Sequence, residues 1–152
     1  MSTVVFVHAH PDDEALLTSG TMARLSDHGH RVVLVTATDG AAGLTSQEVT
    51  DSHNLADVRR AELMESCRIL GVSAFHSLGY ADSGLTGDAE VPSGATRFAD
   101  ADVDQVAAEL VRLFELESAD VVVGYDAAGG YGHPDHLHVH RVVREAAQWY
   151  SF

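Results

Sequence analysis

Two short runs carry histidine and aspartate in the same order, one near each end of the chain. They read His10-Pro11-Asp12-Asp13-Glu14 and His133-Pro134-Asp135-His136. Imidazole nitrogens and carboxylate oxygens are common zinc ligands, and a catalytic zinc site keeps three protein ligands and one open position. His10, Asp13 and His136 therefore predict a zinc site. Asp12 and His133 remain beside these ligands as candidates for acid–base catalysis.

Each run lies between a predicted strand and a predicted helix. Apolar residues at 3–7 precede the first run, and residues 120–125 precede the second. Open α/β sheets bind their ligands at the carboxyl ends of the strands, so we expect both runs at one edge of a sheet. Pro11 suits the first helical position, with Asp12 and Asp13 in the first turn. Alternatively, the first run is only the acidic start of a helix, but that interpretation does not explain why the chain has a second histidine–aspartate run.

The hydrophobic pattern predicts an α/β fold, a Rossmann-like three-layer sandwich with a mostly parallel sheet. Nearly continuous apolar strands that alternate with helices indicate a parallel sheet covered on both faces. We expect strands at 4–9, 31–36, 74–79 and 121–125, and helices at 12–28, 54–70, 102–117 and 134–149. Loops rich in Gly and Asp are expected at 39–52 and 82–101. The length fits a single domain, residues 1–152.

Composition argues against several classes of partner. The 152 residues carry a formal net charge of -14, which argues against nucleic acid or an anionic membrane. No apolar run approaches the roughly 20 residues of a membrane span, and no signal-peptide pattern is present, so a cytoplasmic location is the default expectation. Cys67 is the only cysteine, so we expect a small core residue and no internal disulfide.

With both runs in place, the chain resembles the zinc-dependent de-N-acetylases of the PIG-L or LmbE-like family, which includes deacetylases of the mycothiol and bacillithiol pathways. The resemblance covers nearly the whole chain. Four motifs carry it: residues 9–14, Arg59-Arg60-Ala61-Glu62, Gly79-Tyr80-Ala81-Asp82-Ser83-Gly84 and residues 132–136. The family usually has a glutamate in the loop after the second strand. This chain has Ala41 and Ala42 there, so the resemblance does not select one sugar.

The resemblance implies a site and a reaction. His10, Asp13 and His136 would bind Zn²⁺, Asp12 would be the general base, and His133 would assist the transition state. Three further residues would lie near the substrate: Arg59, Asp82 and Tyr131. The implied activity is that of a zinc-dependent amidohydrolase. Its substrate would be a small-molecule N-acylated amino sugar or glycoside, from which it removes the acyl group.

The residues themselves are compatible with amide hydrolysis. Zinc lowers the pKa of a bound water from about 16 towards 7, so a nucleophile exists at neutral pH. Asp12 is placed to take the remaining proton, and zinc with a protonated His133 would stabilise the oxyanion. We expect Asp135 to hydrogen-bond His133 and keep it charged. Asp12 or His133 then protonates the leaving amine, and the sequence leaves both open.

Three other functions remain as alternatives. A metal phosphoesterase usually needs ligands for two metals, and we find no second set in the sequence. A nucleotide-binding module would carry G-x-G-x-x-G after the first strand, where this chain has carboxylates that repel phosphate. A catalytically inactive metal-binding domain, or one of different specificity, would keep the fold without this reaction.

Several polar residues also have an ordinary structural interpretation. We expect His8 to be packed, and His140 to be a neighbour of the site or a surface residue rather than a ligand. Four other histidines are expected in loops or on the surface: His28, His30, His53 and His76. Arg59 is also spaced for an i,i+3 ion pair with Glu62, and Asp82 for capping a turn.

The C-terminal part of the chain predicts an uncovered edge. Residues 121–123 are apolar on both faces, as in an interior parallel strand, and would lie beside the first strand. The sequence then finishes with Trp149, Tyr150 and Phe152, at a position that is normally polar. An uncovered apolar edge strand favours association. We therefore expect a further C-terminal segment in the native protein, as in its relatives, or a homo-oligomer contact over this edge.

Overall fold

A parallel sheet forms the middle layer of the protein. The computed structural model describes residues 1–43 and 55–152. The strands are β1 (Thr3–His8), β2 (Arg31–Thr38), β3 (Ala74–Tyr80) and β4 (Val121–Val123). They run parallel in the order β3-β2-β1-β4, so β1 has a neighbour on each side. The predicted α/β fold is confirmed, and so is the position of the fourth strand beside the first.

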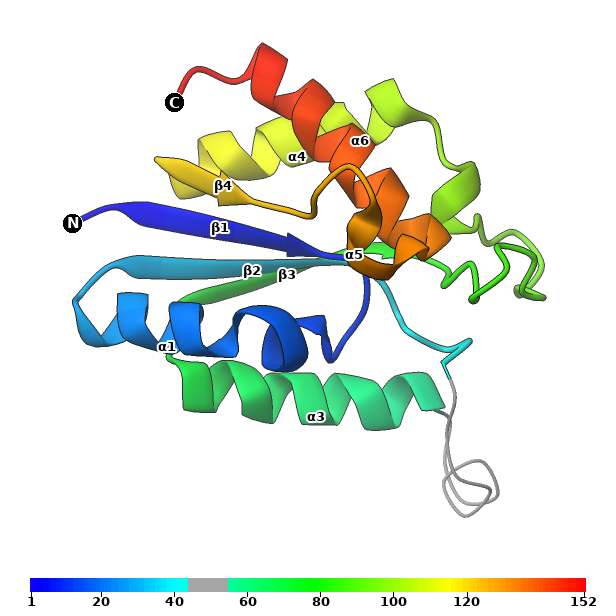
Figure 1. Ribbon diagram of the computed structural model, residues 1–152, viewed down its shortest axis with the longest axis horizontal. Coiled ribbons are helices and arrows are strands. Elements are labelled where there is room, and N and C mark those ends of the chain that lie inside the picture. The colour runs from blue at the N-terminus through cyan, green and yellow to red at the C-terminus, as the bar shows by residue number, and fades with distance from the viewer. Residues whose placement is uncertain (44–54) are drawn as a thin grey trace.

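Helices cover both faces of this sheet (Figure 1). One face carries α1 (Ser19–Asp27) and α3 (Leu55–Leu70), and the other carries α4 (Val103–Glu117) and α6 (Pro134–Trp149). Successive side chains of a strand point to opposite faces. Val5 and Val7 therefore pack towards α4 and α6, whereas Val4 and Phe6 pack towards α1 and α3. Burial on both faces explains why β1 and β2 are apolar almost without interruption.

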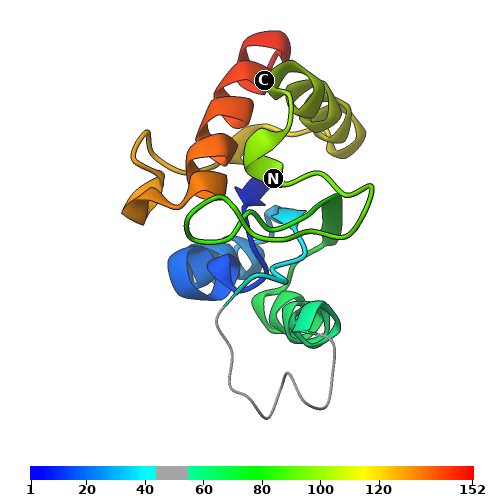
Figure 2. The same ribbon diagram turned by 90° about the vertical axis from the view of Figure 1, so that its right-hand side faces the viewer.

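The carboxyl ends of the strands carry the loops that can form a site, and Figure 2 looks onto this end of the molecule. The turn after β1, the loop after β2 and the segment 81–102 gather there, near the short helix α5 (Gly129–Gly132). The segment after β3 is largely loop, as predicted. It is nevertheless anchored, because Phe98 in the short 3-10 helix η2 (Phe98–Asp100) is fully buried and Ala81 pairs with Arg97.

The helix predicted over residues 12–28 is wrong at its start. Pro11 and Asp12 form a turn, and Asp13 is the N-cap residue of a π-helical stretch, η1 (Glu14–Thr18). The α-helix begins only at Ser19. Asp12 has a φ of 114°, which a right-handed helix cannot accommodate. Neither Asp12 nor Asp13 therefore occupies the first turn of an α-helix.

Other predicted boundaries differ by one or two residues. β3 continues to Tyr80, and β4 ends at Val123 rather than at residue 125. The helix predicted from residue 102 begins at Val103, because the Asp102 side chain caps it by accepting a hydrogen bond from the Gln105 N–H. The last helix, residues 134–149, has the predicted bounds.

His76 lies in β3, within the strand predicted at 74–79 and not in a loop, and its partly exposed side chain pairs with Glu117. The prediction for His53, the predicted helix start at residue 54 and the predicted loop beyond Gly43 fall outside the described residues. Across the two described ranges, every helix is too short or too polar to cross a membrane.

The outer strand β4 is less buried than its apolar sequence suggests. Val121 is 46% exposed, and β4 has one strand neighbour in the described part of the chain. The aromatic C-terminal residues pack partly on the chain itself. The Tyr150 ring contacts Phe114, and the Tyr150 hydroxyl donates to the Ala119 carbonyl. Cover of this edge by a further segment or by a second copy stays a prediction.

Candidate metal centre and active site

The two histidine–aspartate runs meet at the carboxyl ends of β1 and β4. His10 and Asp13 follow β1, and His133 caps the N-terminus of α6, which carries Asp135 and His136. The ring centroid of His10 lies 4.5 Å from that of His133 and 5.3 Å from that of His136. All five side chains are buried. Two distant segments of the chain thus form one polar cluster.

His10, Asp13 and His136 direct three potential ligand atoms towards one point. Asp13 Oδ2 lies 3.6 Å from His10 Nδ1 and 3.4 Å from His136 Nε2. Tetrahedral zinc with bonds of roughly 2.0–2.2 Å places its ligand atoms about 3.3–3.6 Å apart. His136 is fully buried, and its ring nitrogens make no hydrogen bond to any described residue. A buried imidazole without partners is costly, so these three residues fit a zinc ion.

A second group of potential ligands shares His10 with the first. It consists of His10, Asp82, His133 and Asp135. The sequence gives no sign of this group, because Asp82 comes from a third segment, and we expected Asp82 only as a substrate contact. His10 Nε2 lies 3.0 Å from Asp135 Oδ2, and Asp135 also accepts hydrogen bonds from the Ser83 N–H and hydroxyl. A neutral imidazole that donates from Nε2 offers only Nδ1 to a metal, so the second group orients His10 towards the first.

The cluster attracts positive charge. Burial alone would raise the pKa of Asp13, but the neighbouring imidazoles of His10 and His136 and a hydrogen bond from Tyr125 hold it well below its usual range. Burial also opposes ionisation of Asp82, yet His10 lowers its pKa to about 2. Burial would lower the pKa of His10, but hydrogen bonds to the surrounding carboxylates raise it to about 12. A proton on His10 therefore stabilises the cluster without metal, and a metal ion would displace it.

The predicted hydrogen bond between the side chains of Asp135 and His133 is wrong. The Asp135 carboxylate binds His10 and Ser83, and the backbone N–H of Asp135 donates to His133 Nδ1 at 3.2 Å. Burial lowers the pKa of His133, and the neighbouring His10 lowers it further. His133 is therefore neutral, with its hydrogen on Nε2. It can donate a hydrogen bond to an oxyanion without carrying charge.

Asp12 presents a half-exposed carboxylate to the same cavity. Its Oδ2 atom lies 3.4 Å from Arg59 Nη2. Burial raises the pKa of Asp12, Arg59 opposes this shift, and the carboxylates of Asp13 and Glu14 raise the pKa further. A raised pKa makes the carboxylate a stronger base. Asp12 is outside both potential ligand groups, which leaves it free for proton transfer.

The backbone of Asp12 is held in a conformation that residues other than glycine rarely adopt. Its φ is 114°, and such strain costs about 1–3 kcal/mol. Glu14, which is 1% exposed, accepts a hydrogen bond from the Asp12 N–H at 3.0 Å. The Asp12 carbonyl accepts from the N–H groups of Ala15 and Leu16. These contacts maintain the strained turn next to the candidate metal ligands.

Replacing Asp12 by glycine is expected to give a protein about 1 kcal/mol more stable than replacing it by alanine. Both changes remove the carboxylate and its pair with Arg59, but only glycine adopts a φ of 114° without strain. Midpoints of urea unfolding at equal m-values measure the difference. An alanine variant as stable as the glycine variant would show that the backbone at position 12 is unstrained.

Arg59 lies against the loop after β2. A Cβ atom at Gly40 or Gly43 would collide with the Arg59 guanidinium, so glycine at both positions lets the loop approach it closely. Arg59 pairs with Asp12 in the structure. The i,i+3 pair with Glu62, considered from the sequence, is not among the ion pairs of the described residues. This contact places a guanidinium beside the candidate base.

The candidate substrate residues line one cavity of about 410 Å³. It is bordered by His10, Asp12, Asp13, Leu16, Leu17, Ala42, Gly43, Arg59, Asp82, Leu85, Tyr131 and His133. Asp82 is fixed by hydrogen bonds from the N–H groups of Ala42 and Gly84. Tyr131 is 66% exposed, and its ring centroid lies 6.0 Å from that of His133. All three predicted substrate residues therefore reach the same space as Asp12.

Sequence reasoning missed three leucines of the cavity wall. Leu16, Leu17 and Leu85 are well exposed although they are large and apolar. Leu16 and Leu17 fit the pattern of a helix that faces the core, so nothing in the neighbouring sequence indicates that they are exposed. Leu85 has a weak signal, because it is an apolar residue inside a Gly- and Asp-rich loop.

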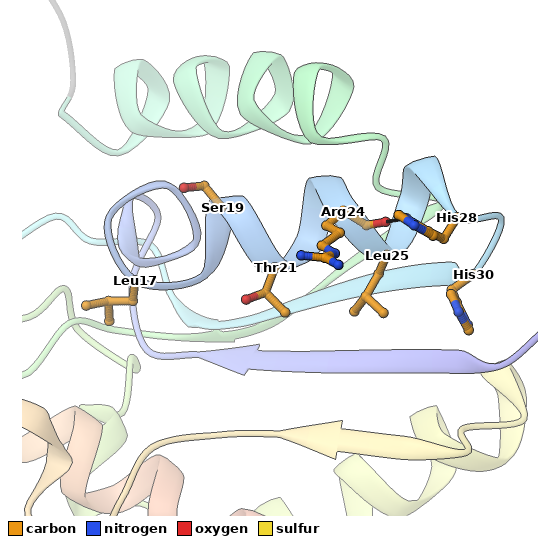
Figure 3. Close-up of a pocket in the computed structure, with 8 residues that line it drawn as sticks. Leu17, Ser19, Thr21, Arg24, Leu25, His28 and His30 are labelled. Carbon is orange, nitrogen blue, oxygen red and sulfur yellow. Dashed lines mark hydrogen bonds between the residues drawn. The ribbon is translucent and has the colours of Figure 1, made fainter.

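A larger surface pocket, of about 640 Å³, lies along α1 and away from the cluster (Figure 3). It is lined by Leu17, Ser19, Gly20, Thr21, Arg24, Leu25, His28 and His30. His28 Nδ1 is hydrogen-bonded to the Arg24 carbonyl, and His30 Nδ1 accepts from the Ser2 N–H. These lining residues include no carboxylate, so the smaller cavity is the candidate active site.

Two other histidines lie close to the cluster. His8 is 2% exposed and packed, as predicted, with its ring nitrogens bonded to the hydroxyls of Tyr125 and Thr18. His140 Nδ1 is hydrogen-bonded to the Tyr125 carbonyl at 2.9 Å. His140 is outside both potential ligand groups, in line with its predicted place beside the site.

A family model described as PIG-L: GlcNAc-PI de-N-acetylase matches residues 5–147. The chain belongs to the PIG-L family. A relative from Catenulispora acidiphila, named 1D-myo-inositol 2-acetamido-2-deoxy-alpha-D-glucopyranoside deacetylase 1, is 40% identical over 157 residues, covering 95% of this chain and 48% of the relative. A deacetylase of the same sugar from Mycobacterium sp. (strain KMS) is 42% identical over 160 residues, covering 96% and 51%. The chain thus spans about half the length of these curated relatives.

Solved structures share the PIG-L fold. N,N'-diacetylchitobiose deacetylase from Pyrococcus horikoshii matches with a TM-score of 0.77 at 30% identity, covering 97% of this chain and 50% of that chain. The zinc-inhibited form of teicoplanin deacetylase matches with a TM-score of 0.72 at 20% identity, covering 97% and 64%. A 4-carboxy-2-hydroxymuconate hydratase matches with a TM-score of 0.73 at 21% identity, covering 96% and 55%. Because a hydratase has this fold, the reaction must be inferred from the site residues.

Proposed function

We propose that this chain carries a zinc-dependent N-deacetylase site that acts on an N-acetylated amino sugar. The observation that carries the proposal is that His10, Asp13 and His136 come together beside a cavity that is lined by His10, Asp13 and the half-exposed carboxylate of Asp12. The names of the curated relatives support an N-acetylglucosaminyl inositol as the substrate. The net charge of -14 favours an uncharged small molecule over nucleic acid.

His10, Asp13 and His136 would hold the zinc ion. When bound, zinc supplies a water of lowered pKa and polarises the amide carbonyl. Asp12 takes a proton from the attacking water, and its raised pKa suits this role. His133 donates from Nε2 to the carbonyl oxygen as it becomes negative. Because His133 Nδ1 already accepts a backbone hydrogen bond, we assign protonation of the leaving amine to Asp12.

Arg59, Asp82 and Tyr131 are the proposed substrate contacts. The Asp82 carboxylate is ionised and buried at the cavity wall, where it can accept a hydrogen bond from a sugar hydroxyl. The exposed ring of Tyr131 offers an apolar face for a sugar ring. Arg59 supplies N–H donors on the side of the cavity that holds Asp12. These three groups would bind the sugar, whereas the acetamido group would lie over the metal ligands.

Release of acetate and free amine from N-acetylated sugars, with zinc present, tests this proposal. We expect hydrolysis of N-acetylglucosaminyl inositol, and slower hydrolysis of N,N'-diacetylchitobiose and N-acetylglucosamine. The matched control is the Asp12→Asn variant, in which the amide cannot take the proton. A folded, zinc-loaded protein that releases no acetate from these sugars would contradict the proposal. Hydrolysis of a phosphate monoester instead would support the phosphoesterase alternative.

A further inference from the structure

Tyr125 lies just beyond β4, and its hydroxyl contacts a proposed metal ligand. The hydroxyl oxygen is 2.6 Å from Asp13 Oδ2, 3.0 Å from the Ala9 backbone nitrogen and 3.1 Å from His8 Nδ1. An ionised carboxylate only accepts hydrogen bonds, so Tyr125 donates to Asp13. The hydroxyl oxygen then accepts from the Ala9 N–H and from His8 Nδ1–H. All three hydrogen-bonding positions of the hydroxyl are occupied, and its direction towards Asp13 is fixed.

His8 and Thr18 support this arrangement from behind. A neutral imidazole that donates from Nδ1 must accept at Nε2, and His8 Nε2 is 2.8 Å from the Thr18 hydroxyl. In the tautomer of His8 that donates to Tyr125, the Thr18 hydroxyl donates to His8 Nε2, a shorter contact than those it makes with the Glu14 carbonyl at 3.5 Å and Met22 Sδ at 3.3 Å. The opposite tautomer would accept the hydroxyl hydrogen of Tyr125 and take it away from Asp13. A directed chain of hydrogen bonds thus runs from Thr18 through His8 and Tyr125 to Asp13.

The ring of Tyr125 contacts a second proposed ligand. It is stacked on the His136 imidazole, with ring centroids 4.1 Å apart and an interplanar angle of 10°. The Tyr125 carbonyl is also bonded to His140 Nδ1 on α6. One residue therefore contacts both ligand-bearing segments, through its hydroxyl at the turn after β1 and through its ring and carbonyl at α6.

We infer that Tyr125 is a positioning residue for the metal centre, because its hydroxyl orients Asp13 while its ring orients His136. The inference rests on the proposed ligand set of His10, Asp13 and His136. Partners that orient metal ligands from outside typically contribute 10–100-fold to metal affinity or activity. Tyr125→Phe keeps the ring on His136 and removes only the hydroxyl, and with it the contacts with Asp13, the Ala9 N–H and His8.

Competition of the metal-free protein with a chromogenic chelator for zinc tests the inference. We expect Tyr125→Phe to bind zinc roughly 10–100-fold more weakly than the unmodified protein. The matched control is Tyr150→Phe, which removes a tyrosine hydroxyl bonded to the Ala119 carbonyl and should leave zinc affinity unchanged. At saturating Co²⁺, the visible spectrum of Tyr125→Phe should also differ from that of the control, because the carboxylate of Asp13 loses one of the two hydrogen bonds that orient it and keeps that from the His10 N–H.

Zinc affinity of Tyr125→Phe within twofold of the control would overturn the inference. If Tyr125→Phe does not fold, Thr18→Val tests the inference instead, because it breaks the same chain of hydrogen bonds at its far end. It should weaken zinc binding in the same direction and by less, and unchanged affinity would overturn the inference. A wrong ligand set can be distinguished from a wrong role for Tyr125. If the ligand set is wrong, His136→Ala still binds zinc although Tyr125 is unchanged.

Discussion

Replacing Asp12 by asparagine is expected to lower kcat by about 10²–10⁴-fold while zinc stays bound. The amide has nearly the shape of the carboxylate but cannot take a proton from water. Asp12 is outside both potential ligand groups, so the change leaves the three proposed metal ligands in place. Steady-state kinetics of amine release and metal analysis of the same sample measure the two effects.

Glu65→Gln is a matched control for the Asp12 variant. It converts a surface carboxylate, paired with Arg68 on α3, into an amide. This control should keep full activity and zinc content. A near-normal kcat of Asp12→Asn would mean that another group takes the proton. Loss of zinc from Asp12→Asn would instead make Asp12 a ligand and exchange the roles of Asp12 and Asp13.

The unmodified protein is expected to hold one zinc per chain, and His136→Ala is expected to lose that metal and with it nearly all activity. His136 is fully buried, and its nitrogens have no other partner among the described residues. Removing it leaves His10 and Asp13, too few ligands for a catalytic zinc site. Zinc content after gel filtration in chelator-free buffer measures the effect.

His140→Ala is the control for this second prediction, because His140 lies one helical turn further along α6 and contacts a backbone carbonyl. It should retain zinc. An undiminished zinc content of His136→Ala would contradict the assignment of His136 as a ligand. Loss of zinc from His140→Ala alone would instead identify His140 as the ligand on α6. Two zinc ions per unmodified chain at equal occupancy would favour the phosphoesterase alternative.

The sequence was informative wherever a short segment determines the outcome. Uninterrupted apolar residues at 31–36 predict a strand buried on both faces, and β2 is one. The two runs predict a common site because the carboxyl ends of neighbouring parallel strands meet at one edge. His10, Asp13 and His136 do lie together there, although their binding of zinc stays a proposal.

Partners that depend on packing between distant segments could not be predicted. The first N–H groups of α6 need acceptors, and His133 Nδ1 supplies one to Asp135. This capping contact with the backbone stands where we predicted a hydrogen bond between His133 and the Asp135 carboxylate. The carboxylate instead binds His10, which lies 125 positions away in the chain. The contact between Tyr125 and Asp13 spans 112 positions and has no local signal.

The prediction for the backbone of Asp12 was wrong for a different reason. A proline followed by two aspartates fits the start of a helix, and propensities favour that interpretation. The structure has a turn with φ of 114° at Asp12, maintained by the buried Glu14. Strain of this kind persists only where surrounding contacts impose it, so a local pattern cannot reveal it.

The position of β1 within the sheet places the proposed metal ligands and the variable cavity walls on different segments of the chain. From β1 the chain proceeds outwards through β2 and β3, then crosses to β4 on the other side, so β1 is the topological switch point. The ligand-bearing segments follow β1 and open α6, whereas the loops after β2 and β3 contribute walls such as Ala42 and Leu85. Wall residues in those loops can vary while the proposed metal ligands stay in place. Such a division would allow the proposed metal centre to be adapted to different substrates.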